Sequence, residues 1–144
     1  MDQGEVARLQ AYLRRLLGAS TLNVKRTGGD EADVLVGETK VADLTKDEDE
    51  GELSYFFNMG LVRAKGAART APLDEGEKSR LQALLNETFG TTGIELRARP
   101  RKTDSVEAYV GDEFIGTVSS DEQPGHVGYF LTMSILDIDL EDEG

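Results

Sequence analysis

Residues able to carry out acid–base or metal chemistry are few in this chain. His126 is its only histidine, and the chain has no cysteine. Without a second histidine, neither a His-based metal cluster nor a Ser-His-Asp set can be assembled, and without cysteine there are no disulfides or thiolate metal sites. We therefore expect His126 to be a solvated residue at a strand edge rather than a general base.

Acidic residues are plentiful, but their spacing does not match a known site. The stretch KDEDEGE, Lys46 to Glu52, offers the carboxylates that calcium prefers. Placing Gly51 at the sixth position of a calcium loop puts Lys46 at the first, where an acid is required. Asp137 and Asp139 lie two residues apart and precede an acidic tail. We predict a solvated hairpin loop for the first stretch and a polar strand face for the second, with no metal or cofactor.

One basic cluster, RARPRK, stands within the acidic second half of the chain. Its charged residues could bind an anionic ligand, or they could belong to an edge strand whose charges discourage aggregation. No aromatic residue is interleaved, as stacking on single-stranded nucleic acid requires. We favour the edge strand and keep anion binding as the alternative; the residues concerned are Arg97, Arg99, Arg101 and Lys102.

Composition narrows the class of protein and of partner. The chain has 144 residues, 38% of them hydrophobic, and a formal net charge of -12. A chain of this length buries more of its surface as one unit than as two separate halves, so we expect one shared core. The start, MDQGEVARLQ, lacks the order of a secretory signal, and no apolar run approaches the ~18 residues that span a bilayer. We expect a soluble cytoplasmic protein that binds neither membrane nor nucleic acid and whose partner is a basic protein.

The chain repeats itself. GELSYFFNMGL at 51–61 returns as GHVGYFLTMSI at 125–135, an offset of 74, and the run RLQA at 8–11 returns at 80–83, an offset of 72. Matches that stay in register over a whole half indicate a tandem duplication. We predict a first repeat at 1–61, a basic linker rich in alanine and glycine at 62–73, and a second repeat at 74–144.

Each repeat reads as one helix followed by four strands, an α+β fold of the order αββββ. Acidic residues at capping-box spacing start each helix, and a glycine suited to a left-handed cap ends it. Period-2 alternation follows, with hairpins around Gly37 and Gly111, so each repeat is an antiparallel meander. The helix signals are Asp2, Glu5 and Gly18 in the first repeat and Asp74, Glu77 and Gly90 in the second.

The last strand of each repeat is apolar on both faces. One face carries Tyr55, Phe57, Met59 and Leu61, matched by Tyr129, Leu131, Met133 and Ile135, while Phe56 and Phe130 lie on the other. One face can take the repeat's own helix, and we expect the second copy to cover the other. This predicts a pseudo-twofold intramolecular dimer with one core, a monomer that mimics a homodimer; edge-to-edge and face-to-face joining both remain open. We also predict that Leu136, Ile138 and Leu140 continue the last strand.

The patterns RLQALL, VEAYVGDEFIGTV and YFLTMSILDIDL in the second repeat resemble a family of short, single-copy alphaproteobacterial proteins known only as a domain of unknown function. The closer match is the second copy, about residues 77–141; the first has Lys40-Val41 where the second has Phe114-Ile115. The resemblance implies the fold and no activity.

The absence of a convergent catalytic set favours a non-enzymatic protein–protein interaction module, an acidic adaptor or chaperone-like protein. Its candidate partner-binding residues are Tyr55, Phe56, Tyr129 and Phe130. The alternative is a small anionic-ligand-binding domain that uses the inter-repeat groove and Arg97, Arg99 and Arg101.

Overall fold

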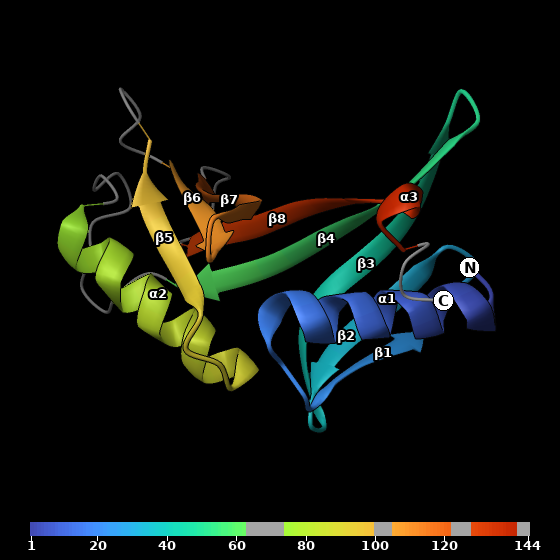
Figure 1. The fold of residues 1–144 in the computed structure, drawn as a ribbon, viewed down its shortest axis with the longest axis horizontal. Coiled ribbons are helices and arrows are strands. Elements are labelled where there is room, and N and C mark those ends of the chain that lie inside the picture. Colours follow the sequence, from blue (N-terminus) through green and yellow to red (C-terminus); the bar gives the residue numbers. More distant parts are fainter. Residues whose placement is uncertain (63–73, 100–104, 122–127, 141–144) are drawn as a thin grey trace.

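The computed structural model describes residues 1–62, 74–99, 105–121 and 128–140. The first repeat consists of α1 (Gln3–Leu17), β1 (Leu22–Arg26), β2 (Glu31–Val36), β3 (Thr39–Asp49) and β4 (Glu52–Val62). The second consists of α2 (Glu75–Phe89), β5 (Ile94–Ala98), β6 (Ser105–Val110), β7 (Glu113–Asp121) and β8 (Gly128–Leu136), followed by α3 (Asp137–Leu140). The predicted α+β fold of two αββββ units is confirmed (Figure 1).

Both long helices begin and end where the sequence predicts. The Asp2 side chain accepts a hydrogen bond from the Glu5 backbone, and the Glu5 side chain accepts one from the Asp2 backbone, which completes a capping box. At the start of α2, the Asp74 side chain likewise accepts a hydrogen bond from the Glu77 backbone. Gly18 and Gly90 follow with φ of 66° and 68°, the left-handed conformation that glycine adopts without steric cost.

The two hairpins that centre on glycine are also confirmed, and they share an irregularity. Gly37 and Gly111 have φ of 62° and 63°. In each repeat the strand after the turn then contains one extra residue: Val41 in β3 and Ile115 in β7 have no Cα partner on the preceding strand. A β-bulge therefore occurs at the same place in both copies, where it bends the strand.

The repeats join edge to edge. The strand order β1-β2-β3-β4-β8-β7-β6-β5 makes one antiparallel sheet of eight strands, with β4 and β8 at its centre (Figure 1). Asn58 pairs with Thr132, which is its own counterpart at the offset of 74. The pairs on either side, such as Tyr55 with Ile135, exchange under the same offset. The pseudo-twofold axis thus passes between Asn58 and Thr132.

Both helices cover one face of this sheet, and a single core lies between them and the sheet. The helices supply buried leucines such as Leu9, Leu13, Leu81 and Leu85. The two central strands supply the predicted alternating row, every member of which is buried: Tyr55, Phe57, Met59, Leu61, Tyr129, Leu131, Met133 and Ile135.

The expectation that the second copy covers the opposite face is wrong. Phe56 is 45% exposed, and Phe130 is half-buried because it packs over Gly60, its partner on β4. Edge-to-edge joining places corresponding faces of both repeats on the same side, so both helices lie there together. Among the described residues, no helix or strand covers the other side.

The predicted strand continuation after Leu136 is also wrong. Pairing of β8 with β4 ends at Leu136, opposite Ser54, and the chain then turns into the short helix α3. Helical geometry directs Leu140 into the core, where it is fully buried, and leaves Ile138 exposed. Burial of Leu140 against α1 and β4 thus outweighs the strand alternation.

Of the helices that the structure describes, none is long and apolar enough to cross a bilayer.

Candidate functional site

The sheet surface opposite the helices is called here the open face. It carries three strongly exposed hydrophobic side chains: Phe56 on β4, Phe114 on β7 and Leu136 at the end of β8, which are 45%, 51% and 49% exposed. Leu136 lies diagonally next to Phe56, because Phe56 pairs with Ser134 and Ser54 pairs with Leu136. Exposed hydrophobic residues that gather on one surface, rather than singly, mark contact sites.

A groove of about 260 Å³ lies on the open face where the two repeats meet. Phe56 comes from the first repeat and all the other lining residues from the second, so the groove exists only in the joined chain. This central groove is lined by Phe56, Phe114, Ile115, Gly116, Thr117, Thr132, Met133 and Ser134.

Gly116 lets β7 approach β8 closely beside the central groove. A Cβ atom at this position would lie 2.3 Å from the Thr132 carbonyl oxygen and 2.7 Å from a Met133 side-chain carbon. Only glycine therefore fits here. Together with the bulge at Ile115, this close approach sets the course of β7 and thereby the place of Phe114.

Phe114 is held from its other side by Tyr109, whose ring in turn packs against the Arg97 guanidinium. The Tyr109 and Phe114 rings meet edge to face, with centroids 5.7 Å apart and planes at 71°. The Arg97 guanidinium carbon lies 4.0 Å from the Tyr109 ring centroid. Edge-to-face and cation–π contacts each contribute about 1 kcal/mol at partly exposed sites. Phe114 is thus exposed yet fixed in position.

The first repeat has a charged cluster where the second has Phe114. The counterpart of Phe114 is Lys40, whose amine lies 3.2 Å from Asp33 and 2.7 Å from Asp43. The hydrogen bond to Asp43, with the one to Asp33, raises the pKa of Lys40. The two halves of the open face therefore differ: one carries an aromatic cluster, and the other carries an ion cluster of one lysine and two aspartates.

The predicted anion-binding residues do not line the central groove in the described structure. Arg97 pairs with Glu95 at 2.9 Å and with Asp112 at 3.7 Å, and Arg99 donates to the Ser105 hydroxyl at 3.2 Å. Arg101 and Lys102 lie outside the described residues, as does His126. The contacts of Arg97 argue against the anion-binding alternative, because its charge is already matched by carboxylates of the chain.

Acidic side chains lie on the open face between Phe56 and the β3–β4 hairpin. Thr45 faces Phe56, and the next pairs along are Asp47 with Ser54 and Asp49 with Glu52. Asp47, Asp49 and Glu52, the acidic row, are exposed, and no ion pair to them occurs among the described residues. Within that same part of the chain, no group of three or more acidic or histidine side chains is placed to hold a metal ion.

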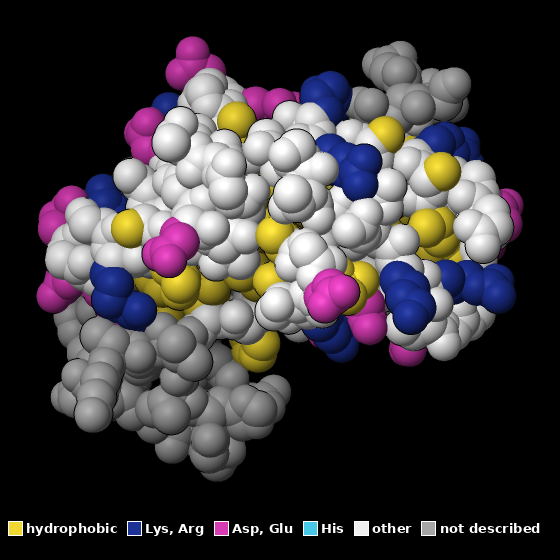
Figure 2. Space-filling model, turned by 90° about the horizontal axis from the view of Figure 1, so that it is seen from below, with side chains coloured by type: hydrophobic (Ala, Val, Ile, Leu, Met, Phe, Trp, Pro, Cys, Tyr) yellow, Lys and Arg dark blue, Asp and Glu magenta, His cyan; other side chains and the backbone are white. Residues whose placement is uncertain are grey.

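The surface is not acidic everywhere. Figure 2, which views the molecule from below, shows lysine and arginine side chains interspersed with carboxylates, and narrow bands of hydrophobic side chains between them. On the face that Figure 2 shows, positive and negative side chains are thus mixed.

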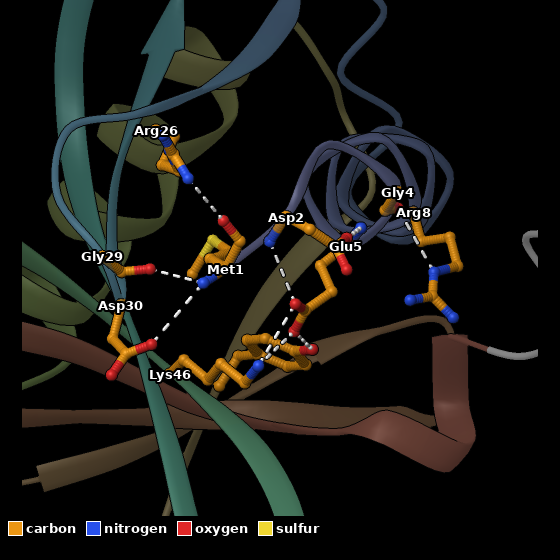
Figure 3. Close-up of polar contacts among 10 residues, drawn as sticks. Met1, Asp2, Gly4, Glu5, Arg8, Arg26, Gly29, Asp30 and Lys46 are labelled. Carbon is orange, nitrogen blue, oxygen red and sulfur yellow. Dashed lines mark hydrogen bonds and ion pairs between the residues drawn. The ribbon is translucent and has the colours of Figure 1, made fainter.

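Two predicted partner-binding residues, Tyr55 and Tyr129, do not reach the surface. They are 0% and 1% exposed, beneath the helices. The Tyr55 hydroxyl donates to the buried Glu5 carboxylate, and the Lys46 amine lies 3.0 Å from the same group (Figure 3). The Tyr129 hydroxyl likewise donates to Glu77, at 3.1 Å. These tyrosines attach each helix start to a central strand, so they are structural and not part of the open face.

The Glu5 carboxylate is strongly stabilised in its charged form. Burial by itself raises the pKa of Glu5, but hydrogen bonds from Tyr55, the α1 cap and Lys46 outweigh it and lower that pKa to about 2. Burial, followed by the hydrogen bond to Glu5, raises the pKa of Tyr55. Neither group lines the central groove, and a tyrosine with a raised pKa is a poor proton acceptor at neutral pH.

The end of β1 and the β1–β2 turn are tied to the start of α1. The Arg26 guanidinium donates to the Met1 carbonyl at 3.1 Å. The Met1 amino group donates to the Gly29 carbonyl and lies 3.5 Å from the Asp30 carboxylate (Figure 3). These contacts hold the helix start against the β1–β2 turn.

Helix side chains also block both outer edges of the sheet. The Gln10 side chain accepts from the Val24 backbone on β1 at 3.0 Å, and Gln82 accepts from Leu96 on β5 at 2.8 Å. Asn86 bonds both the N–H and the C=O of Ile94 at 2.9 Å. Backbone groups that an added strand would need are thus already engaged.

Sequence reasoning identified Phe56 and missed Phe114 and the blocked edges. Gln10 and Gln82 both lie in the repeated RLQA run, which was a usable signal for a shared role. Phe114 stands just after a hairpin turn and has a lysine as its counterpart; only the fold shows that it meets Phe56.

Comparison with known proteins agrees with the duplication. The family model described as "Protein of unknown function (DUF3126)" matches the chain twice, at residues 5–64 and 77–139. The chain belongs to this family and carries two copies of its domain, as the resemblance predicted. Neither the curated proteins nor the solved structures compared with the chain contain a match.

Proposed function

We propose that this tandem member of the family is a protein-binding module without an enzymatic activity of its own, and that it binds its partner on the open face. The observation that carries the proposal is the central groove between Phe56 and Phe114. Both rings are about half exposed on a sheet face that no described helix or strand covers. Full burial of a phenylalanine stabilises by about 1.5–3 kcal/mol, so burying the exposed half of each ring under a docked partner would contribute about 1 kcal/mol per ring.

The surroundings of the groove have the composition of a binding centre. Protein interfaces place aromatic anchors at the centre and polar groups at the rim. Here two aromatic side walls flank a surface that bears the hydroxyl groups of Thr117, Thr132 and Ser134. Because Tyr109 and Gly116 hold Phe114 in position, little conformational entropy is lost when a partner binds it.

The rest of the molecule offers fewer opportunities for binding. The helix-covered face is filled by the core. The outer strands are occupied by Gln10, Gln82 and Asn86, which disfavours binding by strand addition. The open face is the surface of the sheet that remains available among the described residues.

Divergence between the repeats implies a single binding site per chain. A symmetric dimer of identical copies would present two equivalent grooves. Here Lys40, bound to Asp33 and Asp43, replaces Phe114 in the first repeat. We expect one partner molecule per chain.

Site-specific photocrosslinking in the native host tests the proposal. A photoreactive phenylalanine replaces Phe114 in one variant and Glu38, an exposed turn residue, in a control. We expect a crosslinked protein at position 114 that is absent at position 38. The purified partner should bind the wild-type chain at a ratio of one to one, and the double variant F56S/F114S at least ~30-fold more weakly, as for a hot-spot aromatic. No crosslinked protein above the control, or binding that the double variant leaves unchanged, contradicts the proposal.

A further inference from the structure

We infer that the partner binds through a basic segment that places one bulky hydrophobic side chain in the central groove and its lysines or arginines on the acidic row. This inference rests on the proposed function and adds the chemistry of the segment. It follows from three features of the open face: the shape of the groove, the position of the carboxylates and the lack of internal counterions for them.

The groove admits one large side chain. Its volume is about 260 Å³, and its two aromatic walls, Phe56 and Phe114, come from strands of different repeats. Leu136, 49% exposed and diagonal to Phe56, extends the exposed hydrophobic surface along β8 toward the β3–β4 hairpin, whereas Phe130, in the other direction along β8, is half-buried over Gly60. A segment anchored in the groove therefore gains further hydrophobic contact by running toward that hairpin.

Carboxylates lie along the same course. Thr45 is level with Phe56 on the neighbouring strand, and Asp47 and Asp49 follow two and four residues further on the same face. At a rise of about 3.4 Å per residue, these carboxylates lie about 7 and 14 Å beyond the anchor. Side chains of an extended segment repeat at the same interval, so basic residues two and four positions from the anchor would meet them.

The acidic row is available to such a segment. Two of the cations elsewhere on the open face are already engaged: Lys40 with Asp33 and Asp43, and Arg97 with Glu95. Asp47, Asp49 and Glu52 have no ion pair among the described residues. Their repulsion is relieved when a cationic partner approaches, which also speeds the encounter.

The same charges argue against other occupants. A second copy docked through its own open face would bring one acidic row toward another, and the net charge of -12 adds to the repulsion. Nucleic acid and anionic lipid surfaces are repelled for the same reason.

Selection from a random peptide library displayed on phage tests the inference. The library is selected on the wild-type chain after depletion on F56S/F114S. We expect enriched peptides with one bulky hydrophobic residue and, to one side of it, lysine or arginine at alternate positions. A representative synthetic peptide should bind D47N/D49N about threefold to tenfold more weakly than wild type at low salt, from two exposed ion pairs. It should bind the control E38Q/E87Q, which loses the same charge at exposed sites elsewhere, as wild type does.

The other possible outcomes distinguish failure of the basic-segment inference from failure of the protein-binding proposal. Groove-dependent peptides without basic residues, or equal binding to D47N/D49N and the control, overturn the basic segment and leave the protein-binding proposal standing. Failure to enrich any peptide that depends on Phe56 and Phe114, together with failure of the crosslinking above, overturns both. Self-association of the wild-type chain in sedimentation, lost in F56S/F114S, would make a second copy the occupant and overturn the inference.

Discussion

Replacing Glu5 with glutamine should change how the stability of the fold depends on pH. The carboxylate is 6% exposed and accepts hydrogen bonds from the Tyr55 hydroxyl and the Lys46 amine. Glutamine keeps the size and one acceptor oxygen but removes the charge and the titration. The helix cap and the core should therefore persist in the variant, which leaves the electrostatic contribution open to measurement.

The magnitude follows from the pKa. Hydrogen bonding lowers the pKa of Glu5 from 4.5 to about 2, and ~1.4 kcal/mol per unit makes a difference of about 3 kcal/mol. Because the folded-state pKa lies below the unfolded value, this stability is fully present above pH 4.5 and is lost as the pH falls toward 2. The difference in free energy of unfolding between wild type and E5Q should thus narrow by about 3 kcal/mol from pH 7 to pH 2.

Urea unfolding monitored by far-ultraviolet circular dichroism, repeated across this pH range, measures the difference. E38Q serves as the control, because Glu38 is an exposed turn residue. A difference between wild type and E5Q that stays constant with pH, or one that E38Q reproduces, would refute the reasoning. The variant Y55F should reduce the pH-dependent part of the stability, since it removes the hydrogen bond that contributes most to lowering the pKa of Glu5.

Three further predictions concern backbone and surface positions. G116A should lower the free energy of unfolding by about 3 kcal/mol, because the added Cβ would overlap the β8 backbone. The control G29A, whose added Cβ would have no atom within 4 Å, should change the free energy of unfolding by less than about 0.5 kcal/mol. Urea unfolding of both variants and wild type measures the difference. Q10A leaves the Val24 N–H on β1 without its partner, so we expect a loss of about 1–2 kcal/mol and, by light scattering, more association at high concentration; an unchanged transition and mass would contradict this. F56S should lower the free energy of unfolding by no more than about 1 kcal/mol, because the ring is 45% exposed and only its buried half is lost; a clearly larger loss in urea unfolding would show that the ring is structural.

Local elements could be predicted closely because their causes are local. Capping by Asp2 and Asp74 and the left-handed glycines Gly18 and Gly90 depend on residues within a few positions of each other. The open face could be predicted only in part. Phe56 was identified from strand alternation, but Tyr55 was assigned to the same site because alternation does not say which face is covered.

The sequence by itself determined the duplication, the αββββ order of each repeat, the hairpins at Gly37 and Gly111 and the residues that share each face of the last strands. The tertiary structure alone decided that β4 and β8 join edge to edge, that both helices lie on one side, and that Phe56 meets Phe114 across a groove. The physical reason is that backbone hydrogen bonds between strands are the same whichever strand supplies them. The side-chain pattern therefore specifies which residues share a face of a strand, whereas the strand's neighbours and the face that is covered are settled only when the whole sheet assembles.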